Sequence, residues 1–335
     1  MQNEFILCCD WGTTSFRLRL TNLDAEVIAE TISDKGILSH YNDWVNQSDE
    51  NQDRRFDFYL QYIKSQIDQM QPTLNIDLVK LPLVISGMVT SSIGMINLPY
   101  ENIPFAVNAT AGFVCKMQAN GAPILFVTGL CNGDDLMRGE ETQIVGLFHT
   151  AELNDILPAS GIFVLPGTHS KHIAIKNKEI ISIKTFITGE LFKILRENGT
   201  LSKSMEFIND ERNEIPENHA AFKKGILDSK KSSLLNSLFQ VRVNDILNKF
   251  NKEQNFYYLS GLLIGAEFNY LLHDNILNEN NKLVICSSFY LINYYKTVLI
   301  ELGLLNHAVF ISPDLFDKAT VHGQITAYKK YVQTL

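Results

Sequence analysis

The sequence predicts an α/β protein of two domains with duplicated architecture and a cleft between the halves. Strand-like apolar runs alternate along the chain with segments of helical period, which is typical of α/β layers. An apolar strand that leads into a glycine–threonine turn opens the chain and recurs after residue 161. A cluster of proline, glycine and serine lies between the two at residues 157–161. We therefore expect domains at residues 1–155 and 156–335.

The first half is expected to begin with a strand, a tight turn and a second strand. The apolar run at residues 6–9 ends at Asp10, Gly12 supplies the turn, and alternation resumes at Phe16. The same alternation predicts a third strand over residues 25–31. The remaining patterns of this half predict helices over residues 56–70 and 140–148 and strands over residues 81–86 and 123–128.

The second half repeats this opening with almost no residue identity to the first. A strand over residues 162–165 leads into a turn at residues 166–172. Further strands are expected over residues 173–175, 180–187 and 282–285. Residues 202–254 are charged and helical in pattern, and helices are expected over residues 256–272 and 319–332.

Composition narrows the class of partner. The 335 residues are 45% hydrophobic and 20% charged, which is ordinary globular usage and enough for two sizeable cores. The net charge of -8, without any Lys/Arg-rich run, argues against nucleic acid and against an anionic membrane as partner. A small-molecule substrate is the better expectation, and a homodimer stays open.

The cysteines and the start of the chain indicate a cytoplasmic protein. The five cysteines form no C-x-x-C pair and lie mostly among apolar residues, so we expect buried, reduced thiols and no zinc site. The first residues lack a basic region, and Asp10 interrupts the apolar run that follows, so we expect no signal peptide. No apolar stretch is long enough to span a bilayer.

The turn after the first strand has the composition of a phosphate site. Its glycine lets backbone N–H groups approach an anion, and the hydroxyls of Thr13 and Thr14 add donors. The Asp10 carboxylate at the end of the strand is suited to holding a hydrated Mg²⁺. A nucleoside triphosphate is the natural ligand, whereas the alternative is an ordinary hairpin with Asp-x-Gly as its turn.

Several motifs occur in order over nearly the whole chain. They are DWGTT at residues 10–14, SGMVT at 86–90, IGM at 93–95, GLC at 129–131, MRGEETQ at 137–143, LPGTHSK at 165–171, TGEL at 188–191 and LSGLLIGAE at 259–267. The first and the sixth resemble the two phosphate motifs of the actin-like ATPase and sugar-kinase superfamily. The whole combination resembles the 2-keto-3-deoxygalactonokinase family.

This resemblance implies two actin-like (ribonuclease H-like) domains with the active site in the cleft between them. It also implies ATP and Mg²⁺ as cofactors and phosphorylation of 2-dehydro-3-deoxy-D-galactonate at its 6-hydroxyl in galactonate catabolism. Two alternatives stay open: a kinase of another sugar acid, and a non-catalytic actin-like ATP-binding protein. A Rossmann dehydrogenase and a P-loop kinase are not favoured, because neither glycine-rich fingerprint is present.

The resemblance also implies a general base at the start of the helix over residues 140–148. Related sugar kinases have Gly-Asp before a helix at this place, and here Gly139 is followed by Glu140. We expect Glu140 to be the base and leave Glu141 as the alternative. Asp10 would organise Mg²⁺ through water. Without the resemblance, the two glutamates would simply complement the helix dipole.

The remaining site residues fall into two groups. The nucleotide and phosphate contacts are expected from Gly12, Thr13, Thr14, Arg17, Gly167, Thr168, His169 and Ser287. The substrate contacts are expected from Ser86, Gly87, Met88 and Arg138.

Plainer interpretations exist for several of these residues. For Arg17 and Arg138 the alternative is a surface ion pair, which is the commoner role of a lone arginine. For residues 86–88 the alternative is an ordinary strand-to-helix turn. His169 and His172 have metal-like spacing but no third ligand, so no metal site is expected there. Adenine contacts stay open, because Cys286, Ser287 and Ser288 replace the glycine-containing adenosine loop of relatives.

Overall fold

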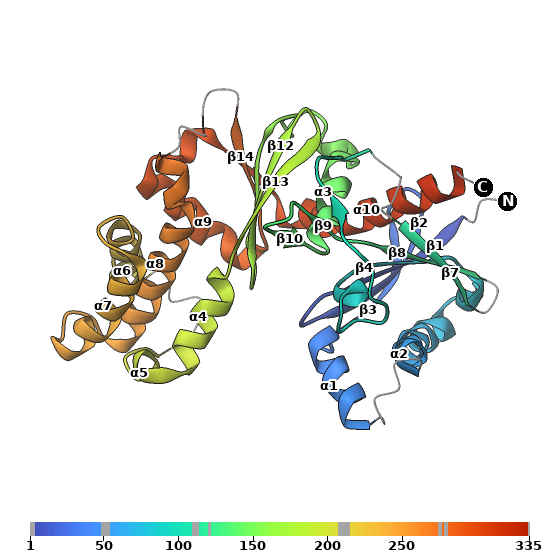
Figure 1. Ribbon diagram of the computed structural model, residues 1–335, viewed down its shortest axis with the longest axis horizontal. Coiled ribbons are helices and arrows are strands. Elements are labelled where there is room, and N and C mark those ends of the chain that lie inside the picture. The colour runs from blue at the N-terminus through green and yellow to red at the C-terminus, as the bar shows by residue number, and fades with distance from the viewer. Residues whose placement is uncertain are drawn as a thin grey trace. The chain divides into compact units, whose positions relative to one another are not determined.

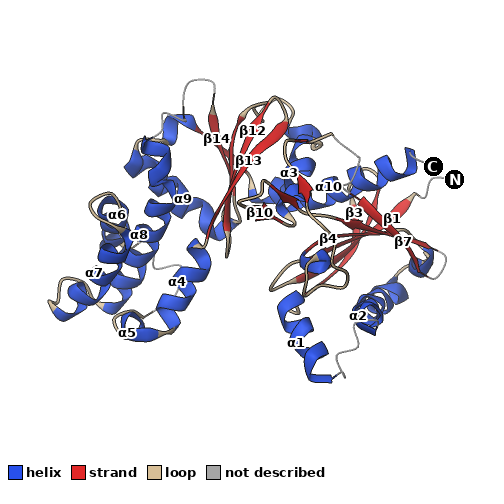
Figure 2. Cartoon of the chain, in the orientation of Figure 1, coloured by secondary structure: helices blue, strands red, loops and turns tan. Residues whose placement is uncertain are grey.

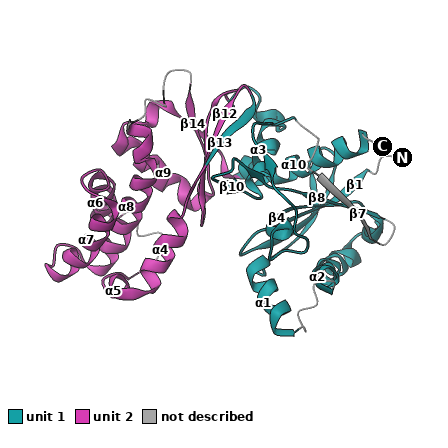
Figure 3. Ribbon diagram, viewed as in Figure 1, with its two compact units in different colours: residues 1–157, 178–183, 314–335 teal, residues 158–177, 184–313 magenta. Residues whose placement is uncertain are grey.

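The computed structural model describes residues 4–47, 54–108, 114–119, 122–206, 215–273, 277 and 281–333. The chain divides into two compact units, which Figure 3 shows in different colours. Unit 1 comprises residues 1–157, 178–183 and 314–335. Unit 2 comprises residues 158–177 and 184–313.

Unit 1 is built on a six-stranded sheet in the order β3-β2-β1-β4-β8-β7 (Figure 1). These strands are β1 (Phe5–Trp11), β2 (Phe16–Asn22), β3 (Val27–Ser33), β4 (Leu83–Gly87), β7 (Val114–Ala119) and β8 (Ala122–Val127). Strand β1 pairs antiparallel with β2 and parallel with β4, and β4 pairs parallel with β8. The helices of this unit are α1 (Ile37–Gln47), α2 (Arg55–Met70), α3 (Glu140–Phe148) and α10 (Pro313–Gln333).

Alternation along β1 and β2 sends side chains to two faces of this sheet. The apolar set lies in a buried cluster with helices α1 and α2, and includes Leu7, Cys9, Trp11, Phe16, Leu18 and Leu20. The opposite face carries Asp10, Arg17 and Arg19 and faces α10. Gln324 of α10 donates from Nε2 to the Cys9 carbonyl at 2.6 Å. The polar residues of the first hairpin therefore lie on one face because strands have a period of two.

Helix α10 packs on α3 within unit 1. A Cβ on Gly146 of α3 would overlap the Ala319 carbonyl, and one on Gly323 would overlap the Thr142 carbonyl, so glycine is what lets the two helices touch. The structure thus differs from the expected domain 156–335, because residues 178–183 and 314–335 are part of unit 1. The chain first passes from unit 1 to unit 2 after residue 157, close to the expected boundary between residues 155 and 156. A helical period does not specify which sheet the helix will cover.

Four short strands complete unit 1. They are β5 (Glu101–Asn102), β6 (Phe105–Ala106), β9 (Leu130–Cys131) and β10 (Leu136–Met137). Strands β10, β9 and β5 form a small sheet in that order. Glu179 of β13 (Glu179–Phe186) pairs with Ala106 of β6 within this unit. The chain passes into unit 2 at residues 183 and 184 of β13.

Unit 2 repeats the strand arrangement of unit 1. Strand β11 (Gly161–Leu165) pairs antiparallel with β12 (Ser170–Lys176) and parallel with β14 (Lys282–Cys286). Strand β14 pairs parallel with β15 (Ala308–Ile311), as β4 does with β8. The duplicated α/β architecture predicted from the sequence is therefore confirmed.

The helices of unit 2 lie to one side of its sheet (Figure 2). They are α4 (Thr188–Glu197), α5 (Gly199–Ser202), α6 (Pro216–Asp228), α7 (Leu234–Ile246), α8 (Lys252–His273) and α9 (Phe289–Leu302). The central helix α8 is buried along most of its length, and its Phe256, Ile264 and Phe268 share a core cluster with Ile162 and Leu283 of the strands. This burial all round explains why α8 is apolar on every face.

Most predicted elements are present with shifted ends. The third strand begins at residue 27, and the last helix at residue 313. Helix α1 and strand β15 were not predicted, and residues 207–214 of the expected helical region lie outside the described residues. Cys8, Cys9 and Cys286 are buried and free, Cys131 is half-buried and free, and the side chain of Cys115 lies outside the description. Within the described ranges, no helix has the length and hydropathy that a bilayer crossing requires.

Candidate functional site

The turn between β1 and β2 presents backbone donors at the surface. The Gly12 amide donates to the Ser15 carbonyl at 2.9 Å and closes the hairpin. The Ile37 amide at the start of α1 donates to the Gly12 carbonyl at 2.9 Å, which fixes the turn against that helix. The amides of Thr13 and Thr14 have no protein acceptor within the described part of the chain. The turn therefore has two backbone N–H groups available to an anion.

The Asp10 carboxylate lies near the end of β1 beside Gly87, which in turn lies against Gly139, and both glycines have positive φ. Gly87 has φ 90°, and a Cβ there would lie 3.3 Å from Asp10 Oδ1 and 2.7 Å from the Trp11 carbonyl oxygen. Gly139 has φ 113°, and a Cβ on it would lie 3.3 Å from the Gly87 Cα. A side chain at Gly87 would collide with the Trp11 carbonyl and crowd the Asp10 carboxylate. Glycine therefore allows these backbone segments to approach one another closely.

The charged groups around Asp10 shift its pKa in opposite directions. Burial raises the pKa of Asp10, and the guanidinium groups of Arg17 and Arg19 act to lower it. The carboxylates of Asp317 and Glu140 raise it further. Asp10 and Glu140 therefore form one electrostatically coupled acidic site within unit 1.

The two glutamates at the start of α3 have different surroundings. Glu140 is half-buried, and its Oε2 accepts a hydrogen bond from the Arg138 amide at 3.0 Å. Glu141 is fully buried and accepts from the Gly139 amide at 2.9 and 2.7 Å and from the Thr142 hydroxyl at 3.1 Å. Burial, with the charge of Glu140 adding to it, raises the pKa of Glu141 to about 8. Of the two, Glu140 is the one with a partly exposed side chain.

The Arg138 guanidinium is buried in a polar and aromatic environment. It donates to the Thr90 hydroxyl and, at 3.0 Å, to the Leu98 carbonyl. It also stacks over the ring of Tyr100 at 4.0 Å from the centroid. Its Nε is buried and has no hydrogen-bond partner in the described structure. One donor of Arg138 is thus unsatisfied by the protein itself.

The segment after β4 contains the other predicted substrate residues. Ser86 is fully buried, and its hydroxyl accepts from Gln324 Nε2 at 2.9 Å. Gly87 lies beside Asp10, as described above, and Met88 is half-buried. The Ser86 hydroxyl therefore contributes to the packing of α10, whereas residues 87 and 88 lie nearer to the acidic site.

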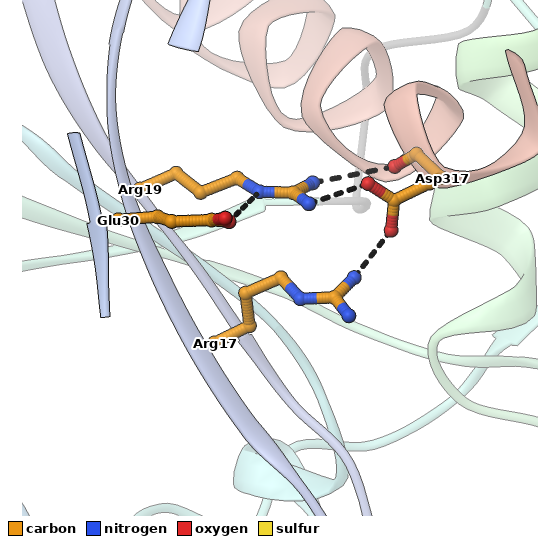
Figure 4. A network of polar contacts seen from close by, with 4 residues as sticks. All are labelled: Arg17, Arg19, Glu30 and Asp317. Carbon is orange, nitrogen blue, oxygen red and sulfur yellow. Dashed lines mark hydrogen bonds and ion pairs between the residues drawn. The ribbon is translucent and has the colours of Figure 1, made fainter. Parts of the chain in front are cut away.

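Arg17 is engaged with helix α10. Its Nη1 forms an ion pair with Asp317, which also binds Arg19 Nη2 at 2.5 Å (Figure 4). Arg19 has a second carboxylate partner, because its Nε donates to Glu30 at 3.1 Å. The surface ion pair considered for Arg17 is thus present, and its expected contact with nucleotide phosphates stays a prediction.

The turn between β11 and β12 in unit 2 is the counterpart of the first turn. Gly167, Thr168 and His169 are all exposed. The Glu190 amide, in the first turn of α4, donates to the Thr168 carbonyl at 2.9 Å, and the Glu190 carboxylate lies 2.5 Å from His169 Nε2. A Cβ on Gly189 would lie 2.5 Å from the Gly167 carbonyl oxygen. The start of α4 therefore fixes the shape of this turn.

Glu267 of α8 is a buried carboxylate that the sequence analysis assigned no role. It accepts from the hydroxyls of Ser170 and Thr188, each at 2.6 Å, and from Tyr295 at 3.2 Å. His172 Nε2 lies 2.9 Å from the same carboxylate. Strand β12 and helices α4, α8 and α9 thus meet at Glu267 directly behind the second turn. The available signal was a single acid at the end of the apolar LSGLLIGAE motif.

An apolar pocket of about 150 Å³ adjoins this second turn within unit 2. Its lining residues are Gly167, Thr188, Gly189, Phe192, Phe256, Ser260, Leu263, Ile264, Leu291, Tyr294 and Tyr295. Ser287 does not line it: its side chain is buried, and its hydroxyl donates to the Ser288 carbonyl at 3.2 Å. The pocket is therefore formed by the turn, the start of α4 and apolar side chains of α4, α8 and α9.

Comparison with known proteins decides the family. A family model described as 2-keto-3-deoxy-galactonokinase matches residues 10–323. The chain belongs to this family. The resemblance to the 2-keto-3-deoxygalactonokinase family, predicted from the ordered motifs, is thereby confirmed.

Individual members of the 2-keto-3-deoxy-galactonokinase family agree with this assignment. The 2-dehydro-3-deoxygalactonokinase of Escherichia coli K12 is 31% identical over 192 residues, which cover 56% of this chain and 60% of that relative. The "Probable 2-dehydro-3-deoxygalactonokinase DgoK1" of Rhizobium meliloti is 29% identical over 264 residues, 77% of each chain. A crystal structure described as a "putative 2-dehydro-3-deoxygalactonokinase protein" from Sinorhizobium meliloti has a TM-score of 0.75 at 25% identity, covering 98% of this chain and 100% of that chain.

The donor set of this family member is compatible with Mg²⁺. Asp10 and Glu140 offer carboxylate oxygens, which are the ligands that Mg²⁺ prefers. Among the described residues, no group of three or more His, Cys, Asp or Glu could hold a metal ion. Mg²⁺ commonly keeps several waters and binds through one or two carboxylates, which is compatible with a site of only two acidic side chains.

Proposed function

We propose that this chain is a sugar-acid kinase that transfers the γ-phosphoryl group of ATP to the 6-hydroxyl of 2-dehydro-3-deoxy-D-galactonate. The family match over residues 10–323 carries this proposal. The named relatives support it, since two of them are called 2-dehydro-3-deoxygalactonokinases. Such an activity would serve galactonate catabolism in the cytoplasm, and the buried free thiols are compatible with that reducing compartment.

Glu140 is the proposed general base. In the transfer, the hydroxyl oxygen of the sugar acid bonds to the γ-phosphorus, the bond to ADP breaks, and the hydroxyl proton passes to the Glu140 carboxylate. Its partly exposed position at the start of α3 supports this role. Glu141 is less suited, because both its oxygens are bonded to the Gly139 amide.

Asp10 is the proposed Mg²⁺ ligand, acting through water. Bound Mg²⁺ would neutralise part of the phosphate charge that opposes attack by the hydroxyl. The position of Asp10 near the end of β1, next to the turn at residues 12–15, supports the role. The neighbouring N–H groups of Thr13 and Thr14 are proposed to bind phosphate oxygens.

Unit 2 is proposed to bind the nucleoside part of ATP. Its apolar pocket has one wall formed by the second turn and α4 and another formed by side chains of α8 and α9. A flat apolar base suits such a lining, while Gly167, Thr168 and His169 would bind phosphate next to it. Gly189 supports this role, because its close approach to Gly167 orders the turn.

Arg138 is the proposed partner of the substrate carboxylate. Its buried Nε lacks a hydrogen-bond partner, so a bound carboxylate would satisfy a donor that the protein leaves unpaired. Gly87 and Met88 are proposed to line the same site. The backbone of Ser86 positions this segment, since its hydroxyl is already bonded to Gln324.

A coupled assay tests the proposal. The full chain is incubated with Mg-ATP and a panel of 2-keto-3-deoxy sugar acids, glycerol and unmodified hexoses, and the product is identified by mass. We expect turnover with 2-dehydro-3-deoxy-D-galactonate and little with glycerol. Equal turnover with glycerol would overturn the substrate, and ATP binding without turnover of any sugar acid would favour the non-catalytic actin-like alternative.

A further inference from the structure

We propose that Asp317 is a positioning residue that holds the Arg17 guanidinium on helix α10 and so keeps it off the Asp10 carboxylate. The consequence for metal binding rests on the proposed function, in which Asp10 binds a hydrated Mg²⁺. The contact between Asp317 and Arg17 is a property of the chain alone. It is therefore testable without catalysis.

The sheet register places Arg17 opposite Asp10. In the antiparallel pair of β1 and β2, Asp10 is the direct partner of Arg17. Directly opposite residues share a face of the sheet with Cβ atoms about 5 Å apart, so opposite charges at such positions ordinarily attract each other. Within the described residues, no ion pair joins Asp10 to Arg17.

Arg17 forms its ion pair with Asp317 instead of with Asp10. Its Oδ1 pairs with Arg17 Nη1, and its Oδ2 pairs with Arg19 Nη2 at 2.5 Å (Figure 4). One carboxylate from α10 thus binds both arginines, one oxygen to each. The four side chains, including Glu30, form a network on the face that also carries Asp10.

Arg17 and Arg19 differ in the carboxylate partners that they have besides Asp317. Arg19 keeps a carboxylate partner without Asp317, because its Nε donates to Glu30 at 3.1 Å. Arg17 has no such second carboxylate, and its Nε is buried with no hydrogen-bond partner in the described structure. Loss of Asp317 would therefore release Arg17, and Asp10 is the acid directly across the strands from it.

An ion pair between Arg17 and Asp10 would compete with a metal. It would neutralise the carboxylate and occupy oxygens that a hydrated cation needs. The competing guanidinium is partly exposed, so solvent screens its attraction and the loss of metal affinity is expected to be roughly 3- to 30-fold. Asp317 in this way leaves the Asp10 carboxylate without an ion pair to Arg17.

The test is a double-mutant cycle on the full chain. The variants are Asp317→Ala, Arg17→Met, the combination of both, and Glu30→Gln as a matched control that removes a carboxylate from the same network. Mn²⁺ serves as the probe, and its dissociation constant in the presence of ADP is measured from the electron paramagnetic resonance signal of the free ion. A crystal structure of Asp317→Ala without metal shows where the Arg17 guanidinium lies.

We expect Asp317→Ala to weaken Mn²⁺ binding roughly 3- to 30-fold when Arg17 is present and less than about twofold in the Arg17→Met background. Glu30→Gln should change it less than about twofold, because Asp317 still holds both arginines. The crystal structure should show Arg17 within about 4 Å of the Asp10 carboxylate. If Arg17 stays away from Asp10 there, or if the loss of Mn²⁺ affinity persists in the Arg17→Met background, the proposal is overturned.

Failure of the proposed function gives a different result. If Asp10→Asn binds Mn²⁺ as the unmodified chain does, the metal role of Asp10 is wrong. The crystal structure of Asp317→Ala still decides whether Asp317 positions Arg17. The two proposals therefore fail in separate measurements.

Discussion

Both carboxylate oxygens of Glu141 accept hydrogen bonds from the Gly139 amide, at 2.9 and 2.7 Å. Glu141 thus reaches back over the start of its own helix and satisfies a donor that an α-helix leaves unpaired at its N-terminus. Its neighbour Glu140 instead accepts from the Arg138 amide and keeps a partly exposed side chain. Two adjacent glutamates in one helical turn are therefore divided between a structural position and an accessible one.

This division predicts which glutamate controls the rate. Glu140→Gln should lower kcat roughly 10²- to 10⁴-fold with little change in substrate KM, as expected on loss of a general base. Glu141→Gln should lower kcat less, because Glu141 is fully buried and both of its oxygens are bonded to the Gly139 amide. Steady-state kinetics of both variants at saturating ATP is the measurement. If Glu141→Gln has the lower kcat, the two roles must be exchanged.

The buried Glu141 also predicts a dependence of stability on pH. Its pKa is raised to about 8 in the folded chain, against about 4.5 for an ordinary glutamate, so the folded state binds more protons between these values. The stabilisation is present below the lower pKa and is lost as pH rises through the higher one. The unfolding free energy should fall between pH 5 and 8 by up to about 1.4 kcal/mol per pH unit relative to Glu141→Gln. Urea unfolding at several pH values measures this, and parallel pH profiles would contradict it.

Asp10→Asn tests the metal role by removing a charge at constant shape. Turnover should fall at least about a hundredfold, since metal and charge stabilisation contributes several kcal/mol to phosphoryl transfer. The fold should survive, because burial disfavours the charged form of Asp10 in any case. The measurement is kcat at saturating Mg-ATP, with circular dichroism to check folding. Near-normal turnover in a folded variant would remove Asp10 from the mechanism.

Gly87 and Gly133 form a matched pair for testing the close contact of Gly87 with Trp11 and Asp10. They have nearly the same positive φ, 90° and 91°, which alanine rarely adopts. A Cβ at Gly87 meets the Trp11 carbonyl oxygen at 2.7 Å, whereas a Cβ at Gly133 meets nothing within 4 Å. Gly133→Ala should cost about 1 kcal/mol of unfolding free energy, and Gly87→Ala should cost clearly more and also lower kcat. Equal losses of stability with unchanged kcat in both would show that the contact with Trp11 and Asp10 is unimportant.

The sequence predicted those strands and helices whose side-chain pattern follows directly from the burial of one face or from residues at their own ends. The alternation through Phe16, Leu18 and Leu20 marked β2, because one face of that strand is buried in a continuous core. Helix α3 was predicted with its observed ends, since Gly139 and two glutamates mark its start. The motif residues near Asp10 and Gly167 were found for the same reason: glycine and hydroxyl side chains at strand ends are local signals.

Long-range contacts account for what the sequence left out. Helix α1 lies in a polar stretch, and its first amides are held by carbonyls of the distant turn at Gly12 and Thr13. The place of α10 in unit 1 depends on Gly146 and Gly323, which are 177 positions apart. No local pattern specifies such a pairing. The contacts of Arg17 with Asp317 and of Glu267 with Thr188 were missed because the two residues of each pair lie far apart in the sequence.

Glu267 gives the sharpest test of a buried polar network in unit 2. Its carboxylate accepts from Ser170, Thr188 and Tyr295 and lies against His172, while its own side chain is fully buried. In Glu267→Gln, an NH₂ group replaces one acceptor oxygen and faces hydroxyl donors. Breaking such a network leaves buried groups unsatisfied, so the unfolding free energy should fall by about 2–5 kcal/mol.

Glu301→Gln is the control for this last prediction, because Glu301 makes a partly exposed ion pair with Lys223 at 2.9 Å. It should change the unfolding free energy by less than about 1 kcal/mol. Both variants are compared by urea unfolding, with the ADP dissociation constant measured on the folded protein. Because Thr188 begins the helix that fixes the second turn, Glu267→Gln should also weaken ADP binding, whereas Glu301→Gln should not. Equal stability of the two variants would mean that the bonds to Glu267 contribute no more than a surface pair.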